Sequence, residues 1–155
     1  MSATTRRVVT GVDDDGTSHV VEDGPAPVEG GFVQLWETDG PLQQPLPDGP
    51  LADSIEPAPG GTWWRLVSIP PVEKLKAGLA SWNTPGIDRD GFHTTATVDY
   101  ITVLDGDVTL VLDRDQVDLH PGDCVIQRGT RHAWHNFGDR PVHMMSVMLS
   151  ARAPG

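Results

Sequence analysis

The chain has 155 residues, a formal net charge of −11 and an isoelectric point of about 4.7. This length fits one domain with a real core. An acidic surface without a cluster of lysine and arginine repels nucleic acid and anionic membranes, so neither is an expected partner. Glycine (17) and proline (14) are abundant beside alternating apolar residues, which indicates many turns rather than disorder.

Compartment is predicted from the cysteine content and the first residues. Cys124 is the single cysteine, so no internal disulfide can form. The opening MSATTRRVVTG lacks the apolar run of a signal peptide, and no stretch approaches the length that spans a membrane. Both features predict a cytoplasmic protein in a reducing environment.

The N-terminal part, residues 1–61, predicts an arm of short strands. RRVVTGVDDDGTSHVVEDG places two β-branched runs on either side of an Asp/Gly turn, which is typical of a hairpin. GGFVQLWETDG predicts another short strand that ends in a turn. Residues 39–61 are rich in proline and show no periodicity, so we expect an irregular surface crossing there.

The remaining chain is dense in strand signals. GTWWRLVSIPP predicts a strand ended by two prolines. PVEKLKAGLASW predicts a short helix, because proline opens it and Val72, Leu75 and Leu79 follow at helical spacing. From Val98 onward about six strands are separated by the turns DGD, DRDQ, HPGD, RGTR and FGDRP. Short strands with no helices between them predict an antiparallel barrel or sandwich.

Two segments carry a resemblance to a known family. PGDCVIQRGTRHAWHN resembles the second motif of the cupin superfamily, and the segment before it resembles the first motif. When Gly106 is aligned with the last glycine of the first motif, Asp99 takes the place of the motif's glutamate. In that alignment Thr95 takes the place of the second histidine and His93 that of the first.

The second motif completes the resemblance, with His132 at the histidine position and Asn136 at the asparagine. The two motifs cover residues 93–136. They imply an all-β fold, the cupin double-stranded β-helix or jelly-roll barrel, over residues 62–150. Residues 1–61 then form an N-terminal arm of the same domain. Cupins are often dimers, and strand-like runs in the arm have edges to cover, so we expect a homodimer.

Alternation along the first motif predicts which side chains share a face. In an extended strand every second residue points the same way. Polar residues come first on that face and apolar ones later, which suits a barrel interior with a polar end and a packed end. The residues on this face are His93, Thr95, Thr97, Asp99, Ile101 and Val103.

The resemblance brings His132 to the same pocket and so suggests an enzyme. The superfamily includes isomerases, lyases, decarboxylases, dioxygenases, storage proteins and sugar-sensing domains, and a fold does not fix a function. We expect a small oxygenated organic substrate, such as a carboxylate or a polyketide-like carbonyl compound. His132 and Asp99 are the candidate acid/base pair of an isomerase, dehydratase or other lyase. A non-catalytic ligand-binding cupin is an alternative.

Three further residues are candidates for binding the substrate: Thr95, Trp134 and Arg65. Arg65 could hold a substrate carboxylate, or form an ordinary salt bridge in a chain with twice as many acids as bases. Trp134 could stack on a planar ligand or fill the core.

A divalent metal (Fe, Mn, Ni or Zn) is the remaining alternative, with His93, Asp99 and His132 as its ligands and a dioxygenase as the function. Two features predict weak binding or none. Thr95 supplies a neutral hydroxyl where cupins usually supply imidazole, and the side chain of Asp99 is one methylene shorter than that of glutamate. Both histidines and Asp99 could instead be hydrogen-bonded core residues.

Overall fold

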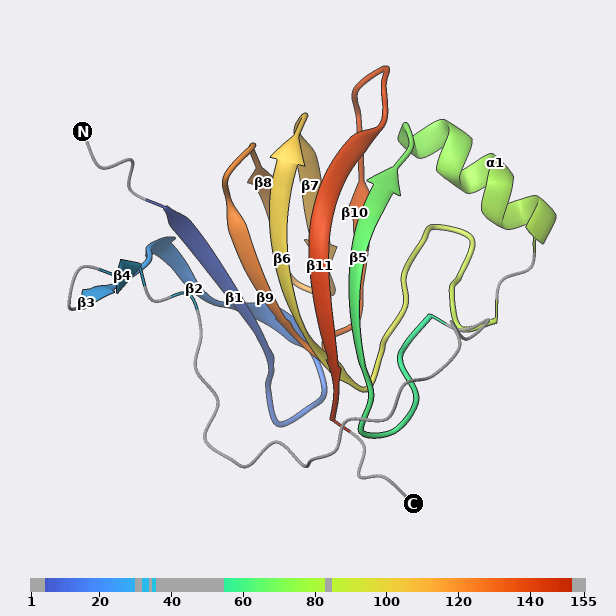
Figure 1. Cartoon of the computed structure of the whole chain (residues 1–155). Helices are drawn as coiled ribbons and strands as arrows, with labels where there is room; N and C mark the ends of the chain where they lie inside the picture. The colour runs from blue at the N-terminus through green and yellow to red at the C-terminus, as the bar shows by residue number, and fades with distance from the viewer. Residues whose placement is uncertain (1–4, 30–31, 34, 36–54, 83–84, 152–155) are drawn as a thin grey trace.

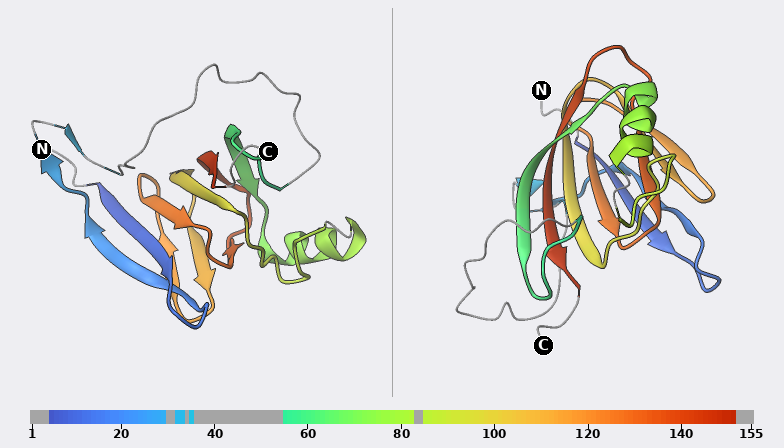
Figure 2. Two further views of the ribbon diagram at one scale, coloured as in Figure 1. Left: turned by 90° about the horizontal axis from the view of Figure 1, so that it is seen from below. Right: turned by 90° about the vertical axis from the view of Figure 1, so that its right-hand side faces the viewer.

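The computed structural model describes residues 5–29, 32–33, 35, 55–82 and 85–151. Within them the chain forms strands in two main sheets and a single helix, α1 (Val72–Trp82). The sheets pack against each other around one apolar core, and α1 lies beyond the end of strand β5 (Figures 1 and 2). This is the all-β jelly-roll architecture that the sequence predicts.

The larger sheet has six strands and places the N-terminal hairpin at one edge. All neighbouring strands are antiparallel except β1 and β9, which are parallel. The predicted arm therefore contributes two strands to the barrel sheet itself. In spatial order the strands are β2 (Ser18–Pro25), β1 (Arg6–Val12), β9 (Cys124–Arg128), β6 (Thr97–Asp105), β11 (Val142–Ser150) and β5 (Thr62–Ile69).

The smaller sheet has three antiparallel strands and covers the other side of the core. Their order is β10 (His132–His135), β7 (Val108–Leu112) and β8 (Gln116–Leu119). Two short strands, β3 (Val28–Glu29) and β4 (Phe32–Val33), pair with each other.

The predicted elements are largely confirmed. The hairpin, the strand over residues 62–69, the helix that starts after Pro71 and the six strands β6–β11 all form where the sequence indicates them. The predicted strand in GGFVQLWETDG is observed over two residues, Phe32–Val33. The proline-rich crossing at 39–61 lies mostly outside the described residues, because these resume at residue 55.

Strand β6 carries the alternation that builds the barrel interior. Its inward residues Thr97, Asp99, Ile101 and Val103 are buried, and the residues between them are half-buried or exposed. The apolar half of this row belongs to one core cluster with residues of both sheets, including Leu110 of β7. The predicted interior, polar at one end and packed at the other, is thus observed.

Asn136 ties the second motif to the neighbouring elements. Its side-chain amide donates to the carbonyl of Ile69 at 2.9 Å and to that of Arg140 at 2.8 Å, and its Oδ1 accepts from Gly138 N–H. Its backbone carbonyl accepts from Val72 N–H at the start of α1. The asparagine of the motif therefore has a structural role at the apolar end of the barrel.

No helix in the described part of the chain is long and apolar enough to cross a membrane.

We propose that two copies of the chain associate through the outer side of this barrel. Strands β2 and β5 end the larger sheet, and β5 presents Trp64 (75% exposed) and Leu66 (70% exposed) on its outward face. Light scattering at micromolar concentration should give about twice the chain mass of 16.7 kDa. The double variant Trp64→Ser/Leu66→Ser should be monomeric with unchanged circular dichroism, because an exposed edge with apolar side chains favours association. A monomeric wild type contradicts the proposal.

Candidate functional site

The centre of the polar end is a pair of histidines on neighbouring segments. His93 and His132 exchange backbone hydrogen bonds of 3.0 Å in both directions, and their ring centres are 4.3 Å apart. Each ring is oriented by its Nδ1, which lies 3.0 Å from a backbone carbonyl two residues earlier, Gly91 for His93 and Thr130 for His132. Because a carbonyl can only accept, both Nδ1 atoms carry the proton and both Nε2 atoms keep a lone pair.

Both imidazoles are held in the neutral form. Burial, together with the neighbouring His93, lowers the pKa of His132 to about 3, although the bond to the Thr130 carbonyl opposes the shift. Burial likewise lowers the pKa of His93. A neutral imidazole with a free Nε2 can accept a hydrogen bond or bind a metal, but it is a weak base.

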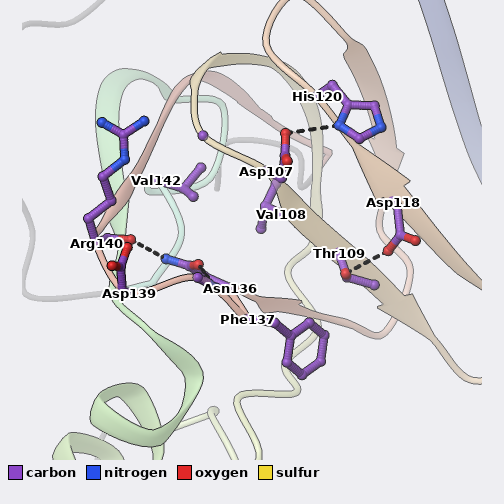
Figure 3. A pocket seen from close by; sticks show the side chains of 12 residues that line it. Asp107, Val108, Thr109, Asp118, His120, Asn136, Phe137, Asp139, Arg140 and Val142 are labelled. Atoms are coloured by element: carbon purple, nitrogen blue, oxygen red, sulfur yellow. Dashed lines mark hydrogen bonds and ion pairs between the residues drawn. The ribbon is translucent and has the colours of Figure 1, made fainter.

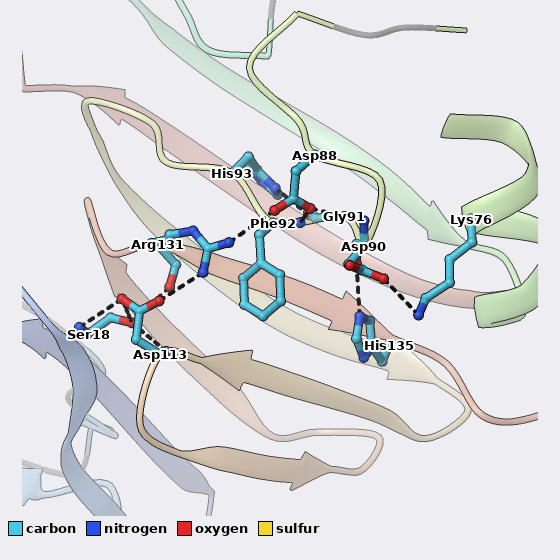
Figure 4. A network of polar contacts seen from close by, with 10 residues as sticks. All are labelled: Ser18, Lys76, Asp88, Asp90, Gly91, Phe92, His93, Asp113, Arg131 and His135. Atoms are coloured by element: carbon cyan, nitrogen blue, oxygen red, sulfur yellow. Dashed lines mark hydrogen bonds and ion pairs between the residues drawn. The ribbon is translucent and has the colours of Figure 1, made fainter. Parts of the chain in front are cut away.

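The loop before His93 is fixed by a polar network (Figure 4). Asp88 accepts backbone hydrogen bonds from Asp90 and Phe92 through Oδ1, and its Oδ2 accepts from Arg131 at 3.0 Å. The same guanidinium lies 4.1 Å from the ring centre of Phe92 and donates to Asp113 at 2.8 Å. The loop that offers the acceptor for His93 is therefore anchored to the residue that precedes His132.

A second set of contacts holds the other side of this loop. Lys76 of α1 forms an ion pair of 2.9 Å with Asp90, and His135 of β10 hydrogen-bonds the Asp90 carbonyl at 3.0 Å. His135 lies on the opposite face of β10 from His132. Its side chain therefore points to the loop (Figure 4).

Asp99 is the buried carboxyl of the site. It is 4% exposed, and its Oδ1 has no hydrogen-bond partner in the part of the chain that the structure describes. Burial raises its pKa to about 6, and a hydrogen bond from Thr97 opposes the rise. No hydrogen bond joins Asp99 to His132 among the described residues, since the Thr130 carbonyl orients His132 instead. The expected acid/base dyad is therefore two separate groups on the inner wall.

Gln127 is a polar residue of the interior that the sequence analysis missed. It is fully buried on β9 directly across from Asp99, and its Oε1 also has no hydrogen-bond partner among the residues described. Its Nε2 donates to the hydroxyl of Thr130. In β9, Gln127 lies two residues after Val125, which faces the core. This alternation is the sequence signal that predicts an inward side chain at Gln127.

Arg65 faces the interior from the opposite edge of the sheet. Its guanidinium lies 3.1 Å from the ring centre of Trp63, and burial lowers its pKa. The described residues give Arg65 no ion pair or side-chain hydrogen bond, so the salt bridge considered from sequence is not observed within them. An arginine without an acidic partner, in an acidic chain, is available to an anionic ligand.

The two other predicted binding residues are buried. Thr95 is 2% exposed and hydrogen-bonds the hydroxyl of Thr97 at 2.8 Å, so the pair extends the polar row toward Asp99. Trp134 is 7% exposed and belongs to the core cluster. Its ring packs edge-on against that of His132, with the two ring centres 5.9 Å apart. Contact of either residue with a substrate stays a prediction.

The histidine pair fits part of a metal site. Two imidazoles that share one ion through Nε2 at about 2.1 Å have ring centres roughly 4–5 Å apart, which agrees with the pair observed. Within the described ranges, however, no three His, Cys, Asp or Glu side chains form a group that could hold a metal ion. His93, Asp99 and His132 are therefore not assembled as a three-residue ligand set.

A cavity of about 470 Å³ lies at the other end of the barrel (Figure 3). It is lined by the β6–β7 turn and the β10–β11 turn, with Phe137 71% exposed beside it. Its polar groups pair mostly with one another, as in His120 with Asp107 at 2.9 Å and Thr109 with Asp118 at 2.7 Å. None of the predicted site residues lines this cavity.

Comparison with known proteins agrees with this fold. The Cupin_2 family, described as a cupin domain, matches residues 84–148. Phomopsin biosynthesis cluster protein C' of Diaporthe leptostromiformis is 38% identical over 80 residues, 50% of this chain and 34% of that protein. Cupin-domain-containing oxidoreductase virC of Hypocrea virens is 34% identical over 64 residues, 39% of this chain and 33% of that protein.

The match with each of these relatives spans about a third of the relative's length. Among solved structures, a Cupin 2 conserved barrel domain protein from Salinispora arenicola aligns with a TM-score of 0.43 and 22% identity. That alignment covers 68% of this chain and 72% of the other.

The raised pKa of Asp99 gives the stability a defined pH dependence. Below pH 4 the carboxyl is protonated in both the folded and unfolded states, and above pH 6 it is ionised in both. Ionisation in the buried site costs about 2–3 kcal/mol, so this contribution to stability is lost as pH rises from 4 to 6. Urea unfolding should show Asp99→Asn gaining that amount over wild type between pH 4 and pH 7.

The exposed Asp139→Asn is the matched control and should track wild type at every pH. A constant difference between Asp99→Asn and wild type would mean that Asp99 titrates normally in the folded protein.

Proposed function

We propose that this chain, which belongs to the cupin superfamily, binds a small oxygenated organic molecule at the polar end of the barrel and moves a proton on it. The reaction class is that of a lyase, dehydratase or isomerase. The observation that carries the proposal is the buried Asp99 carboxyl, with one oxygen unpartnered and a pKa of about 6. A proton carrier works best when its pKa lies near the working pH.

Asp99 and His132 are the two candidate proton carriers. The pKa of Asp99 is raised and that of His132 is lowered, and this contrast indicates which of them transfers the proton. At pH 7 a carboxyl with a pKa of about 6 is mostly ionised yet is readily protonated. The buried imidazole of His132, whose pKa lies well below its ordinary value, is neutral at that pH. We therefore assign proton transfer to Asp99, and we assign His132 the role of a neutral hydrogen-bond acceptor.

The other residues bind and orient in this mechanism. Arg65, stacked on Trp63, supplies the positive charge that holds an acidic or carbonyl oxygen of the substrate. The Thr95–Thr97 hydroxyl pair donates toward Asp99 and keeps its second oxygen in place. The largely apolar wall excludes water, which strengthens each of these polar contacts.

A second candidate function, a metal-dependent oxidoreductase, is favoured by the paired Nε2 atoms of His93 and His132. These two side chains would hold the ion, with water or substrate as its remaining ligands. A bound divalent ion would supply Lewis acidity or redox chemistry at this end of the barrel. Two relatives of this chain, from Hypocrea virens and Aspergillus ruber, are named cupin-domain-containing oxidoreductases, although each match covers about a third of that protein.

Turnover by variants tests the assignment of Asp99. Extracts of the source cells are incubated with the protein, and the molecule that disappears is identified by mass spectrometry. Asp99→Asn should then lower kcat on that substrate by about 10²–10⁴-fold, the usual contribution of a positioned proton carrier. The pH profile of kcat/KM for wild type should bend near pH 6.

Asp139→Asn is an exposed substitution at the other end of the barrel. It should leave kcat and the pH profile of kcat/KM unchanged. Full activity of Asp99→Asn would place the proton carrier elsewhere. Consumption of dioxygen during turnover would replace the main proposal with the oxidoreductase.

Metal content tests the second candidate. Two imidazoles with no third ligand from the described parts of the chain should give weak, substoichiometric binding of a divalent ion that dialysis against a chelator removes. His93→Ala and His132→Ala should each abolish what is bound, whereas His120→Ala, at an exposed histidine, should not. Stoichiometric metal that survives the chelator in elemental analysis would show that the site is stronger than its donor set indicates.

A further inference from the structure

Two buried oxygen atoms on the inner wall receive no hydrogen bond from any of the described residues. They are Oδ1 of Asp99 and Oε1 of Gln127, on residues that are 4% and 0% exposed. The two residues are directly opposed in the β6–β9 ladder. A buried acceptor without a donor costs about 1–3 kcal/mol, so a neighbouring pair of them favours a ligand that brings a donor.

The amide of Gln127 is committed to its present orientation. Its Nε2 donates to the Thr130 hydroxyl, and that hydroxyl also lies 3.3 Å from the hydroxyl of Thr10. Thr10 in turn contacts the Ile126 carbonyl at 3.1 Å. These contacts hold Nε2 on the side of Thr130 and leave Oε1 free to accept.

Arg65 of β5 lies on the same inner wall as these two oxygen atoms, and it has no acidic partner in the described chain. Across the sheet from Asp99, Met148 of β11 is opposed to Trp63 of β5, and Arg65 is stacked on that tryptophan. One strand lies between β6 and β5, so the backbones of Asp99 and Trp63 are about 10 Å apart.

The wall between the acceptors and the cation is mostly apolar. Met148 lies between Asp99 and Trp63 in the ladder, and Ile101, 5% exposed, is the next inward residue of β6. Ser146 of β11, 6% exposed, lies between Ile101 and Arg65. The row therefore offers acceptors at one end, one serine hydroxyl in an otherwise apolar middle and a cation at the other end.

From this arrangement we infer that the ligand is a hydroxylated carboxylic acid with an apolar middle. Its hydroxyl lies between Asp99 Oδ1 and Gln127 Oε1, which share its single proton in a bifurcated hydrogen bond, and its carboxylate pairs with Arg65. The inference rests on the proposed function, because it concerns the same interior site. It adds Gln127 as a residue that determines specificity.

Hydroxybenzoates test this inference, because a rigid ring fixes the hydroxyl at three separations from the carboxylate. Calorimetric titrations compare 2-, 3- and 4-hydroxybenzoate with benzoate, which lacks the hydroxyl, and with 4-hydroxybenzamide, which lacks the charge. The 3- or 4-isomer should bind at least about tenfold more tightly than benzoate, the usual effect of a hydrogen bond to a charged group. It should also bind more tightly than the amide.

Variants assign each preference to its residue. Gln127→Met, which keeps the length and removes the oxygen, and the nearly isosteric Asp99→Asn should each reduce the preference for the hydroxyl. Arg65→Met should abolish the preference for the charge. Arg140→Gln, in the cavity at the other end, should change neither. If Gln127→Met fails to fold, Asp99→Asn and the wild-type comparison still decide.

Histidine NMR signals separate failure of this inference from failure of the proposed function. If benzoate binds as tightly as every hydroxybenzoate and shifts the signals of His93 and His132, the interior site stands and the inference is wrong. If the acids bind without shifting either histidine, the site itself is misplaced and both are wrong. If no acid binds, the inference is overturned, and turnover by Asp99→Asn decides the proposed function.

Discussion

Strand β6 is hydrogen-bonded on both sides, to β9 and to β11, and this double pairing determines what faces the barrel interior. A slip of one residue would turn Asp99 outward and Tyr100 inward, so the apolar row further along the strand fixes the polar row as well. Ile101 and Val103 are 5% and 1% exposed, and their burial holds the register. The free energy gained by packing at one end thus maintains an unfavourable buried carboxyl at the other.

The same reasoning explains how much of the site could be predicted. The period of two survives from Thr95 to Val103, so the inward row was readable from sequence, and the turns gave the strand boundaries. The roles proposed for Gln127 and Arg65 depend on residues that lie beside them in the fold. Gln127 is opposed to Asp99 on β6, and Arg65 is stacked on Trp63. Those neighbours follow from cross-strand register, which a single sequence does not specify.

The partner of His132 shows a second limit of sequence reasoning. An aspartate and a histidine in one predicted pocket suggest a hydrogen-bonded dyad, yet the ring is held by the Thr130 carbonyl two residues earlier. His93 is held in the same way by Gly91. Backbone carbonyls are present at every position, so no residue pattern marks the ones that become acceptors. The consequence for chemistry is large, since a bond to a neutral carbonyl raises the pKa of a buried imidazole less than a bond to a carboxylate does, and burial then keeps the ring neutral.

Charge is distributed unevenly between the surface and the interior. The surface of this acidic chain places most arginines beside carboxylates, as Arg6 with Asp23 and Arg131 with Asp88. The interior reverses this arrangement: Arg65 and Asp99 face the same space, separated by the width of one strand, without an ion pair. Burial then works against the charge of both groups, lowering the pKa of the arginine and raising that of the acid. A molecule that brings an anion to one and a donor to the other relieves both costs at once, and this shared relief is a source of binding energy that neither group provides alone.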